Sequence, residues 1–320
     1  MRRAIGFALA LLSAATAAAA PEPSALADGV YLFPGHFESG EQPDGNSVLL
    51  RGSEGWIVFD AGRHAGHAQA LLDFLRAAAP QPIVALFNSH WHLDHSGGDA
   101  ALRTAFPDLK LYASTALAGA QKVFLPRYRA QLQDEITRPG QKAATASADR
   151  DEIQRIDSLR MPDVTIENSS ERTVAGRKLS VGLETYAVTS GDVWVLDEAS
   201  GVLAAGDLVT LPAPLFDTAC PKGWRRALAH LEQQPFKQLV PGHGEPMKPK
   251  AFKRYRRAFE NLLDCADSTQ PAAECVAGWL SDAGPLVPER DWALAQSLLK
   301  YYLSQRLRGA GAAANTDCSG

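Results

Sequence analysis

Short apolar runs separated by turn-forming residues begin the pattern after residue 28. Three of these runs are rich in β-branched and apolar residues and lie between Gly, Pro, Asp and Asn, which predicts strands over residues 29–33, 47–51 and 56–59. Residues 64–79 carry leucines at helical spacing and end before Pro80, which predicts a helix. The chain therefore starts as β structure and then begins to alternate.

The alternation of strands and helices continues through the middle of the chain. We expect strands over residues 82–87, 109–113 and 238–240, several more between 164 and 205, and helices over 98–106 and 223–233. Chains that alternate in this way fold as layered α/β or mixed structures. No internal repeat is visible in the sequence.

Two helical segments interrupt or extend this pattern. Residues 114–161 are polar and helical in propensity, with a break at Pro139-Gly140, and we expect a helical insertion over the core. Within it, residues 127–129 are expected on a surface helix and not against an anionic substrate. Residues 251–320 form a predicted helical C-terminal extension of a main domain over residues 21–250. Residues 248–257 include six basic residues, which helical spacing places on a solvated face.

The first twenty residues differ from the rest. Arg2 and Arg3 precede an apolar run over residues 4–12 and a small-residue stretch over 15–20, and proline follows at once. This pattern is typical of a secretory signal peptide, because the apolar run is too short to span a bilayer. We therefore expect residues 1–20 to be removed and the protein to be periplasmic or secreted. No later segment has the length of a transmembrane helix, so no membrane association is expected after cleavage.

Composition narrows the partners. The chain has 320 residues, of which 46% are hydrophobic and 21% charged, as in a packed protein. Lys and Arg number 32 against 36 Asp and Glu, a net charge of −4, so we expect a small-molecule substrate and no nucleic acid. Cys265 and Cys275 flank a short polar turn, and an exported protein allows a disulfide there worth about 3 kcal/mol. Cys220 and Cys318 would remain as a second pair, although four cysteines permit three connectivities.

The strongest chemical signal follows the strand predicted over 82–87. Three histidines and an aspartate lie within six residues: His90, His92, Asp94 and His95. In an extended chain His90 and His92 point to the same side, and two imidazoles on one side can chelate a metal. Asp94 and His95 follow where the chain turns into a helix, and they can face a neighbouring metal.

This His-x-His-x-Asp-His run resembles the signature of the metallo-β-lactamase fold superfamily. Three further motifs occur in the order of that family: Asp60-Ala61-Gly62, Gly206-Asp207-Leu208 and Pro241-Gly242-His243-Gly244. The resemblance implies an α+β fold, a four-layer αββα sandwich, with a metal site along one edge. It also implies that Asp207 bridges two metals, that His243 is a ligand and that Asp60 supports the ligands from behind. Glyoxalase II enzymes, lactonases, alkylsulfatases and β-lactamases share these motifs, so they identify a site and not a substrate.

One ligand that the resemblance implies is missing. The family has a histidine in a segment that here reads Val188-Thr189-Ser190-Gly191-Asp192, and Val188 stands in its place. The first metal site keeps His90, His92 and a share of Asp207. The second site keeps Asp94, His95, His243 and its share of Asp207, which meets the usual count of three protein ligands. We predict metal in the second site and a first site that is weak, vacant or filled differently.

Other histidines could replace the missing ligand. His36 lies in a loop between the first two strands, which family members use to cover the site. His64 and His67 lie three residues apart on one predicted helix. For all three, a role in an ordinary loop or a solvated helix face is the stronger prediction.

These features predict an exported metal-dependent hydrolase that uses a metal-activated water on an ester, thioester, lactone or lactam-type bond. Asp94 would be the catalytic residue that orients the water or takes its proton. We expect one or two zinc ions, with iron as the alternative because two histidines and a carboxylate also hold iron. The alternatives are a metal-binding or sensor protein without turnover and an iron-dependent oxidative member of the same fold. The sequence leaves the substrate and the oligomeric state open.

Overall fold

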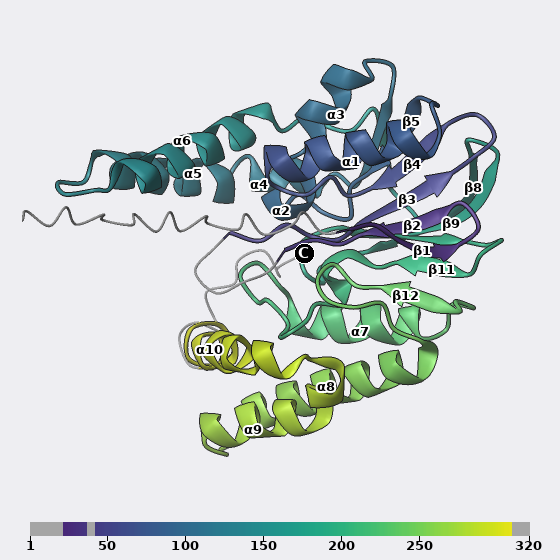
Figure 1. Ribbon diagram of the computed structural model, residues 1–320. Helices are drawn as coiled ribbons and strands as arrows, with labels where there is room; N and C mark the ends of the chain where they lie inside the picture. The colour runs from purple at the N-terminus through teal and green to yellow at the C-terminus, as the bar shows by residue number, and fades with distance from the viewer. Residues whose placement is uncertain (1–21, 37–41, 309–320) are drawn as a thin grey trace, which may run out of the picture.

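The computed structural model describes residues 22–36 and 42–308, so the expected signal peptide and Cys318 lie outside the described residues. Two β-sheets pack face to face between layers of helices (Figure 1). The first sheet runs in chain order: β1 (Ser24–Ala27), β2 (Val30–Phe33), β3 (Ser47–Arg51), β4 (Trp56–Phe59), β5 (Ile83–Phe87), β6 (Lys110–Ala113) and β7 (Val164–Thr165). The second sheet has the order β12 (Gln238–Val240), β11 (Val202–Ala204), β10 (Asp192–Asp197), β9 (Arg177–Glu184) and β8 (Ser170–Val174). This is the predicted αββα sandwich.

Side chains of the first sheet alternate between two buried faces. Those that pack between the sheets include Val48, Leu50, Ile57 and Phe59. Those that pack against α1 (Ala65–Ala78) include Leu49, Trp56 and Val58. Because successive residues of a strand point to opposite faces, β3 and β4 read as continuous apolar runs and not as alternating ones. The edge strand β1 was not predicted, since its half-exposed residues show no apolar alternation.

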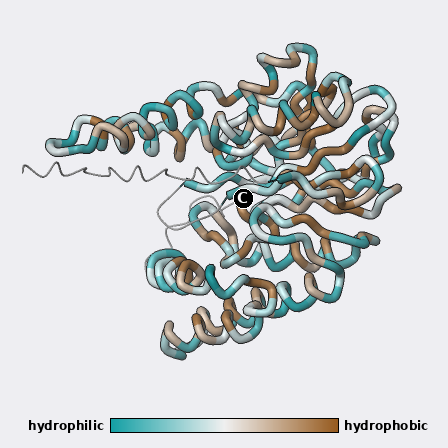
Figure 2. The backbone as a smooth tube through the Cα atoms, in the orientation of Figure 1, coloured by the Kyte–Doolittle hydropathy of each residue, from teal (hydrophilic) through white to brown (hydrophobic). Residues whose placement is uncertain are grey.

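The predicted insertion consists of three helices, α4 (Ala116–Ala120), α5 (Phe124–Thr137) and α6 (Ala143–Ser158). α5 and α6 form a hairpin that extends from the upper layer in Figure 1 and turns at Pro139-Gly140, as the sequence predicted. α1 and α3 (Asp99–Ala105) complete the upper layer. Figure 2 shows hydrophobic residues concentrated in the interior, while much of the hairpin is hydrophilic.

Helices of the C-terminal half cover the outer face of the second sheet. They are α7 (Pro221–Leu231), α8 (Pro249–Asp267), α9 (Ala272–Ala283) and α10 (Trp292–Tyr302). Trp224, Phe259 and Trp279 are fully buried in this layer, where they pack with side chains of β10 and β11. The prediction of a helical C-terminal extension over 251–320 missed an irregular stretch between α9 and α10, where Pro288 interrupts the helix.

The turn between α8 and α9 carries the predicted disulfide. Cys265 and Cys275 are bonded, ten residues apart. Replacing both with serine should lower the free energy of unfolding by about 3 kcal/mol, because the bond restricts the unfolded chain. Chemical denaturation of the double variant beside the wild type, without reductant, measures this difference. An unchanged midpoint would mean that packing alone holds the two helices together.

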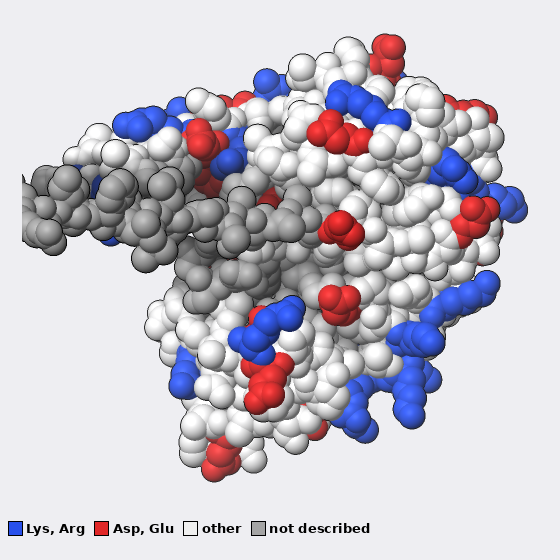
Figure 3. All heavy atoms as spheres, in the orientation of Figure 1, with Lys and Arg blue, Asp and Glu red and all other residues white. Residues whose placement is uncertain are grey.

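Within residues 22–36 and 42–308, the structure contains no helix with the length and apolar content needed to cross a membrane. Basic side chains gather at the lower right of Figure 3, near the N-terminal half of α8. The opposite face of that helix buries Phe252 and Tyr255, so the basic residues lie on a solvated face, as predicted.

Candidate metal centre

The candidate ligands lie where strands of both sheets end. Asp60 follows β4, and the His-x-His-x-Asp-His run follows β5 and leads into the short helix α2 (Leu93–Ser96). Asp207 lies in a 3-10 turn over Gly206–Leu208 after β11, and His243 lies shortly after β12. The carboxyl ends of neighbouring parallel strands meet at one edge, so these side chains converge although they come from distant parts of the sequence.

The structure brings the predicted side chains together in two groups. In each group the candidate ligand atoms all lie within 4.8 Å of one another. The first group is His90, His92 and Asp207, and the second is Asp94, His95, Asp207 and His243. Both groups are almost wholly buried and share Asp207. This arrangement could hold two neighbouring cations, with three protein ligands available to the first and four to the second.

One detail of the sequence prediction was wrong. Residues 89–91 are bends and not part of an extended strand, so regular strand alternation is not what brings His90 and His92 together. Their ring centroids nevertheless lie 4.5 Å apart, as do those of His90 and His95. The bends and the turn into α2 gather the three imidazoles around one point.

Neighbouring groups fix which nitrogen of each histidine is free. The Ser89 hydroxyl donates to Asp60 Oδ2 at 2.7 Å, so at 2.9 Å it must accept from His90 Nδ1. The Nδ1 of His95 lies 2.8 Å from the same Asp60 Oδ2 and donates to it. Because Nδ1 carries the one proton of a neutral imidazole, Nε2 of His90 and of His95 is the nitrogen that can bind a cation once each ring is neutral, and both face the centre.

The Thr218 hydroxyl holds His92 in the opposite tautomer, with the proton on Nε2. The Thr218 hydroxyl donates to the carbonyl oxygen of Val188 at 2.9 Å. The Nε2 of His92 lies 2.9 Å from this hydroxyl and must therefore donate to it, which leaves the lone pair on Nδ1. Neither Ser89 nor Thr218 was found from the sequence, because such roles depend on contacts and not on a motif.

Unpaired buried atoms show that these residues fit a cation. His90 Nε2, His95 Nε2 and both carboxylate oxygens of Asp207 are buried and have no hydrogen-bond partner in the described part of the chain. Buried polar atoms without a partner are rare and costly, and ligation by a metal satisfies them. The backbone also keeps space here, since a Cβ on Gly242 would lie 2.0 Å from Asp207 Oδ1.

The electrostatics favour ionised carboxylates. Burial alone raises the pKa of Asp207, but the imidazoles of His95 and His243 outweigh it and hold that pKa below its usual range. The pKa of Asp94 also lies well below its usual range despite burial, because of His95 and a hydrogen bond from His243. Three carboxylates in turn hold the pKa of His95 well above its usual range. A cation that binds here would displace the second proton of His95, and it would lie beside the negative charges of Asp94 and Asp207.

Asp60 supports the candidate ligands through several hydrogen bonds. Its carboxylate accepts hydrogen bonds from the Ser89 backbone N–H, the Ser89 hydroxyl and His95. Its φ of 61° lies in the left-handed region, which Asp and Asn tolerate better than most residues. Burial raises the pKa of this carboxyl, with His95 opposing the shift. The supporting role implied by the sequence resemblance therefore has a structural basis.

The alternative histidines lie outside both groups. Neither His36, His64 nor His67 belongs to a cluster of candidate ligands among the described residues. His64 Nδ1 lies 2.8 Å from the Asp44 carboxylate, and His67 Nε2 lies 3.2 Å from the Ser47 hydroxyl. These two histidines therefore form hydrogen bonds next to the turn after β4.

A family model, the metallo-beta-lactamase superfamily, matches residues 41–263. The chain belongs to this superfamily. Members of the metallo-β-lactamase superfamily bind divalent metals, typically zinc, and the two candidate groups lie within the matched region.

Individual relatives cover different shares of the chain. A hydroxyacylglutathione hydrolase from Trichormus variabilis is 43% identical over 58 residues, which is 17% of this chain and 23% of that protein. A solved metallo-β-lactamase from Pontibacter korlensis matches with a TM-score of 0.55 and 21% identity, over 75% of this chain and 99% of that one. A double mutant of a sec-alkyl sulfatase matches with a TM-score of 0.61 and 20% identity, over 90% of this chain but 51% of that one. At this identity the solved structures show the shared fold alone.

The sequence prediction places Val188 where the superfamily pattern has a histidine, and the structure shows the surroundings of this residue. Its side chain is buried in the apolar cluster beneath the second sheet, and its carbonyl oxygen anchors Thr218 beside His92. The segment is tied down by Asp192, which accepts hydrogen bonds from the backbone N–H groups of Val188 and Thr189. The position thus adjoins the first group, which has one candidate ligand fewer than the second.

Replacing Val188 with histidine should raise the metal content per chain, because it offers the first group a fourth ligand. The larger side chain should cost about 1–3 kcal/mol of stability, since the site is well packed. Metal analysis after dialysis measures the effect, and Val188→Leu is the control for added bulk. A folded histidine variant with the metal content of the leucine variant would contradict the placement of this segment.

Proposed function

We propose that this protein is an exported metal-dependent hydrolase that uses water to cleave an ester, thioester, lactone or lactam-type bond, and that its first metal site is incomplete. The observation that carries the proposal is the convergence of the two candidate groups on Asp207. The lone pairs of His90, His92 and His95 are fixed by their neighbours to face that carboxylate. Such preorganised lone pairs have no function in packing.

In this proposal His90 and His92 with Asp207 hold one cation, and Asp94, His95 and His243 with Asp207 hold the other. Bound there, a divalent cation would supply the positive charge that acidifies water and polarises the bond to be cleaved. The second position has the fuller set of ligands, so we expect it to bind metal more tightly. Zinc suits these nitrogen and oxygen ligands, and iron is the alternative.

Asp94 is our candidate for handling the proton. Its Oδ2 lies 3.0 Å from His243 Nε2 and 3.6 Å from His95 Nε2, and it also lines a cavity beside the centre. Because its pKa is held well below the usual range, the carboxylate is ionised and can accept a hydrogen bond from water. It would thereby orient the water towards a substrate in the cavity or take up its proton.

The test begins with the full-length chain purified without chelator. Zinc and iron are quantified, and a panel of ester, thioester, lactone and β-lactam substrates is assayed before chelation, after chelation and after metal is restored. We expect chelator-sensitive turnover and about one tightly bound metal per chain. Activity that persists in chelator would contradict the metal-dependent mechanism. Two tightly bound metals after dialysis would contradict the incomplete first site, and retention in the cytoplasm would contradict export.

A further inference from the structure

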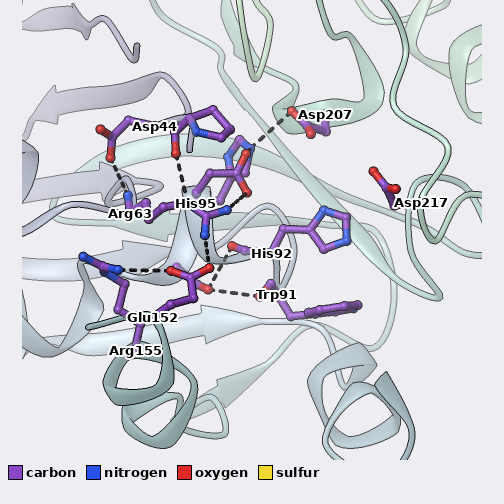
Figure 4. A network of polar contacts seen from close by, with 12 residues as sticks. Asp44, Arg63, Trp91, His92, His95, Glu152, Arg155, Asp207 and Asp217 are labelled. Atoms are coloured by element: carbon purple, nitrogen blue, oxygen red, sulfur yellow. Dashed lines mark hydrogen bonds and ion pairs between the residues drawn. The ribbon is translucent and has the colours of Figure 1, made fainter. Parts of the chain in front are cut away.

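A cavity of about 300 Å³ opens beside His92 and Asp94. This volume is at the lower end of the range for small-molecule sites. Its walls combine the bend after β5 with two segments that supply none of the candidate ligands: the α5–α6 hairpin and α10. Figure 4 shows part of this wall, where Trp91 lies beside His92 and Glu152 approaches from α6.

Much of the wall is aromatic or aliphatic. The rings of Trp91 and Phe124 lie 5.1 Å apart, and those of Phe124 and Tyr128 lie 6.0 Å apart. Leu215 and Leu298 line the cavity as well, the latter from α10. An apolar group of a ligand would bury its surface against these side chains, which is favourable in proportion to the area removed from water.

The charges of the wall are already paired. Arg63 is the one Lys or Arg among the lining residues that the structure describes, and it is itself buried. Its guanidinium forms an ion pair with Glu152, lies 3.7 Å from Asp94 Oδ1, and donates from Nε to the Pro43 carbonyl oxygen at 3.1 Å. Asp94 and Glu152 thus offset its positive charge, and Glu152 also pairs at 3.0 Å with Arg155, which does not line the cavity.

Acidic groups also outnumber this cation. Asp217 lines the same cavity, and its carboxylate accepts a hydrogen bond from the Tyr302 hydroxyl at 2.6 Å. A ligand carboxylate here would lie near a cation that is already paired, and near the further negative charge of Asp217. Burial of a charge without a partner is strongly unfavourable, whereas an uncharged group incurs no such cost.

We propose that this cavity binds an uncharged apolar group of the substrate, aromatic or short and branched, and disfavours the same group when it carries a carboxylate. This inference rests on the proposed hydrolytic function and specifies its substrate class. The Arg63–Glu152 ion pair acts as a charge filter, because a paired Arg63 offers little attraction to a ligand carboxylate. The hairpin and α10 supply the apolar surface.

The test uses two isosteric probes that differ in charge, 4-acetamidobenzamide and 4-acetamidobenzoate, with binding measured by calorimetry on the protein as purified. The matching esters, 4-carbamoylphenyl acetate and 4-carboxyphenyl acetate, are assayed for hydrolysis. We expect the wild type to prefer the neutral probe at least tenfold. Glu152→Gln should leave Arg63 underpaired and reduce this preference by about tenfold. The attraction of a carboxylate to a metal is common to wild type and variant, so the change in the ratio isolates the cavity.

Two controls make the result decisive. Glu135→Gln makes the same charge change on α5, where Glu135 pairs with Arg138 away from the cavity, and it should leave the ratio unchanged. Asp217→Asn removes the second carboxylate without altering the Arg63 pair, and it tests the filter if Glu152→Gln does not fold. A ratio that stays constant in both folded cavity variants would overturn the proposal. Discrimination in binding without hydrolysis of any ester would support the cavity assignment and count against the hydrolase.

Discussion

Replacing Asp60 with asparagine should lower metal affinity by about 10- to 100-fold or more, with the fold kept. Asparagine tolerates the positive φ at this position, and its oxygen can still accept from the Ser89 backbone N–H. Its amide group, however, faces His95 Nδ1 as a donor. The His95 proton would then move to Nε2, the nitrogen that faces the centre, and a protonated nitrogen cannot bind a metal. A carboxylate that fixes a histidine tautomer has this effect in serine proteases, where the asparagine variant keeps the geometry and loses activity.

Competition with a chromophoric chelator measures the affinity of the Asp60 variant. Asp99→Asn is the matched control, because it makes the same substitution at a second buried carboxyl, whose pKa burial holds well above its usual range. Asp99 is also buried and accepts a hydrogen bond from the Asn88 side chain at 2.7 Å, and it belongs to neither group of candidate ligands. Equal metal affinity for wild type and the folded Asp60 variant would rule out the tautomer argument.

Replacing Asp207 with asparagine should have a larger effect, with metal content falling below one ion per chain and hydrolysis falling to the chelator-treated level. Both candidate groups share this carboxylate, and its two oxygens are buried without hydrogen-bond partners. The amide keeps the shape but removes the negative charge on which both cations would depend. Loss of a supporting residue costs about 10- to 100-fold, so loss of a shared ligand should exceed that.

Thermal unfolding with and without added zinc separates this effect from misfolding. The wild type should gain stability from zinc by mass action, and the Asp207 variant should gain little. Asp264→Asn makes the same charge change on α8, where the side chain is 69% exposed, and should behave as wild type. If the Asp207 variant retained a normal metal content, the shared position of this carboxylate would have no functional meaning.

The main elements of the fold could be predicted because apolar residues mark their buried positions in the sequence. β3, β4 and β12 have the predicted bounds, since continuous apolar runs between turn residues leave little choice of structure. β1 was missed because it gains its place by pairing with β2, and its own residues are half exposed. The bend at 89–91 was missed because the metal-binding motif fixes residue types and not the backbone path.

Within the candidate centre, the sequence predicted the ligands but not the residues that support them. His90, Asp207 and His243 could be found because they occur in short motifs that follow predicted strands. Their supports could not, because Thr218 and Glu152 act through contacts across long stretches of chain. Tyr128 illustrates the difference: the sequence suggested a plain surface helix, but its ring lines the cavity. Position in a motif is local information, whereas the lining of a cavity depends on packing between distant segments.

Two of the segments that line the cavity carry none of the candidate ligands. The α5–α6 hairpin and α10 are attached to the sandwich and extend beyond it, whereas the candidate ligands lie on turns at the ends of its strands. Under the proposed function, substitutions in the hairpin or in α10 would alter which molecules bind in the cavity and leave the reaction at the metal centre unchanged. Such a division of labour lets specificity diverge between related proteins without the loss of a working centre on the way.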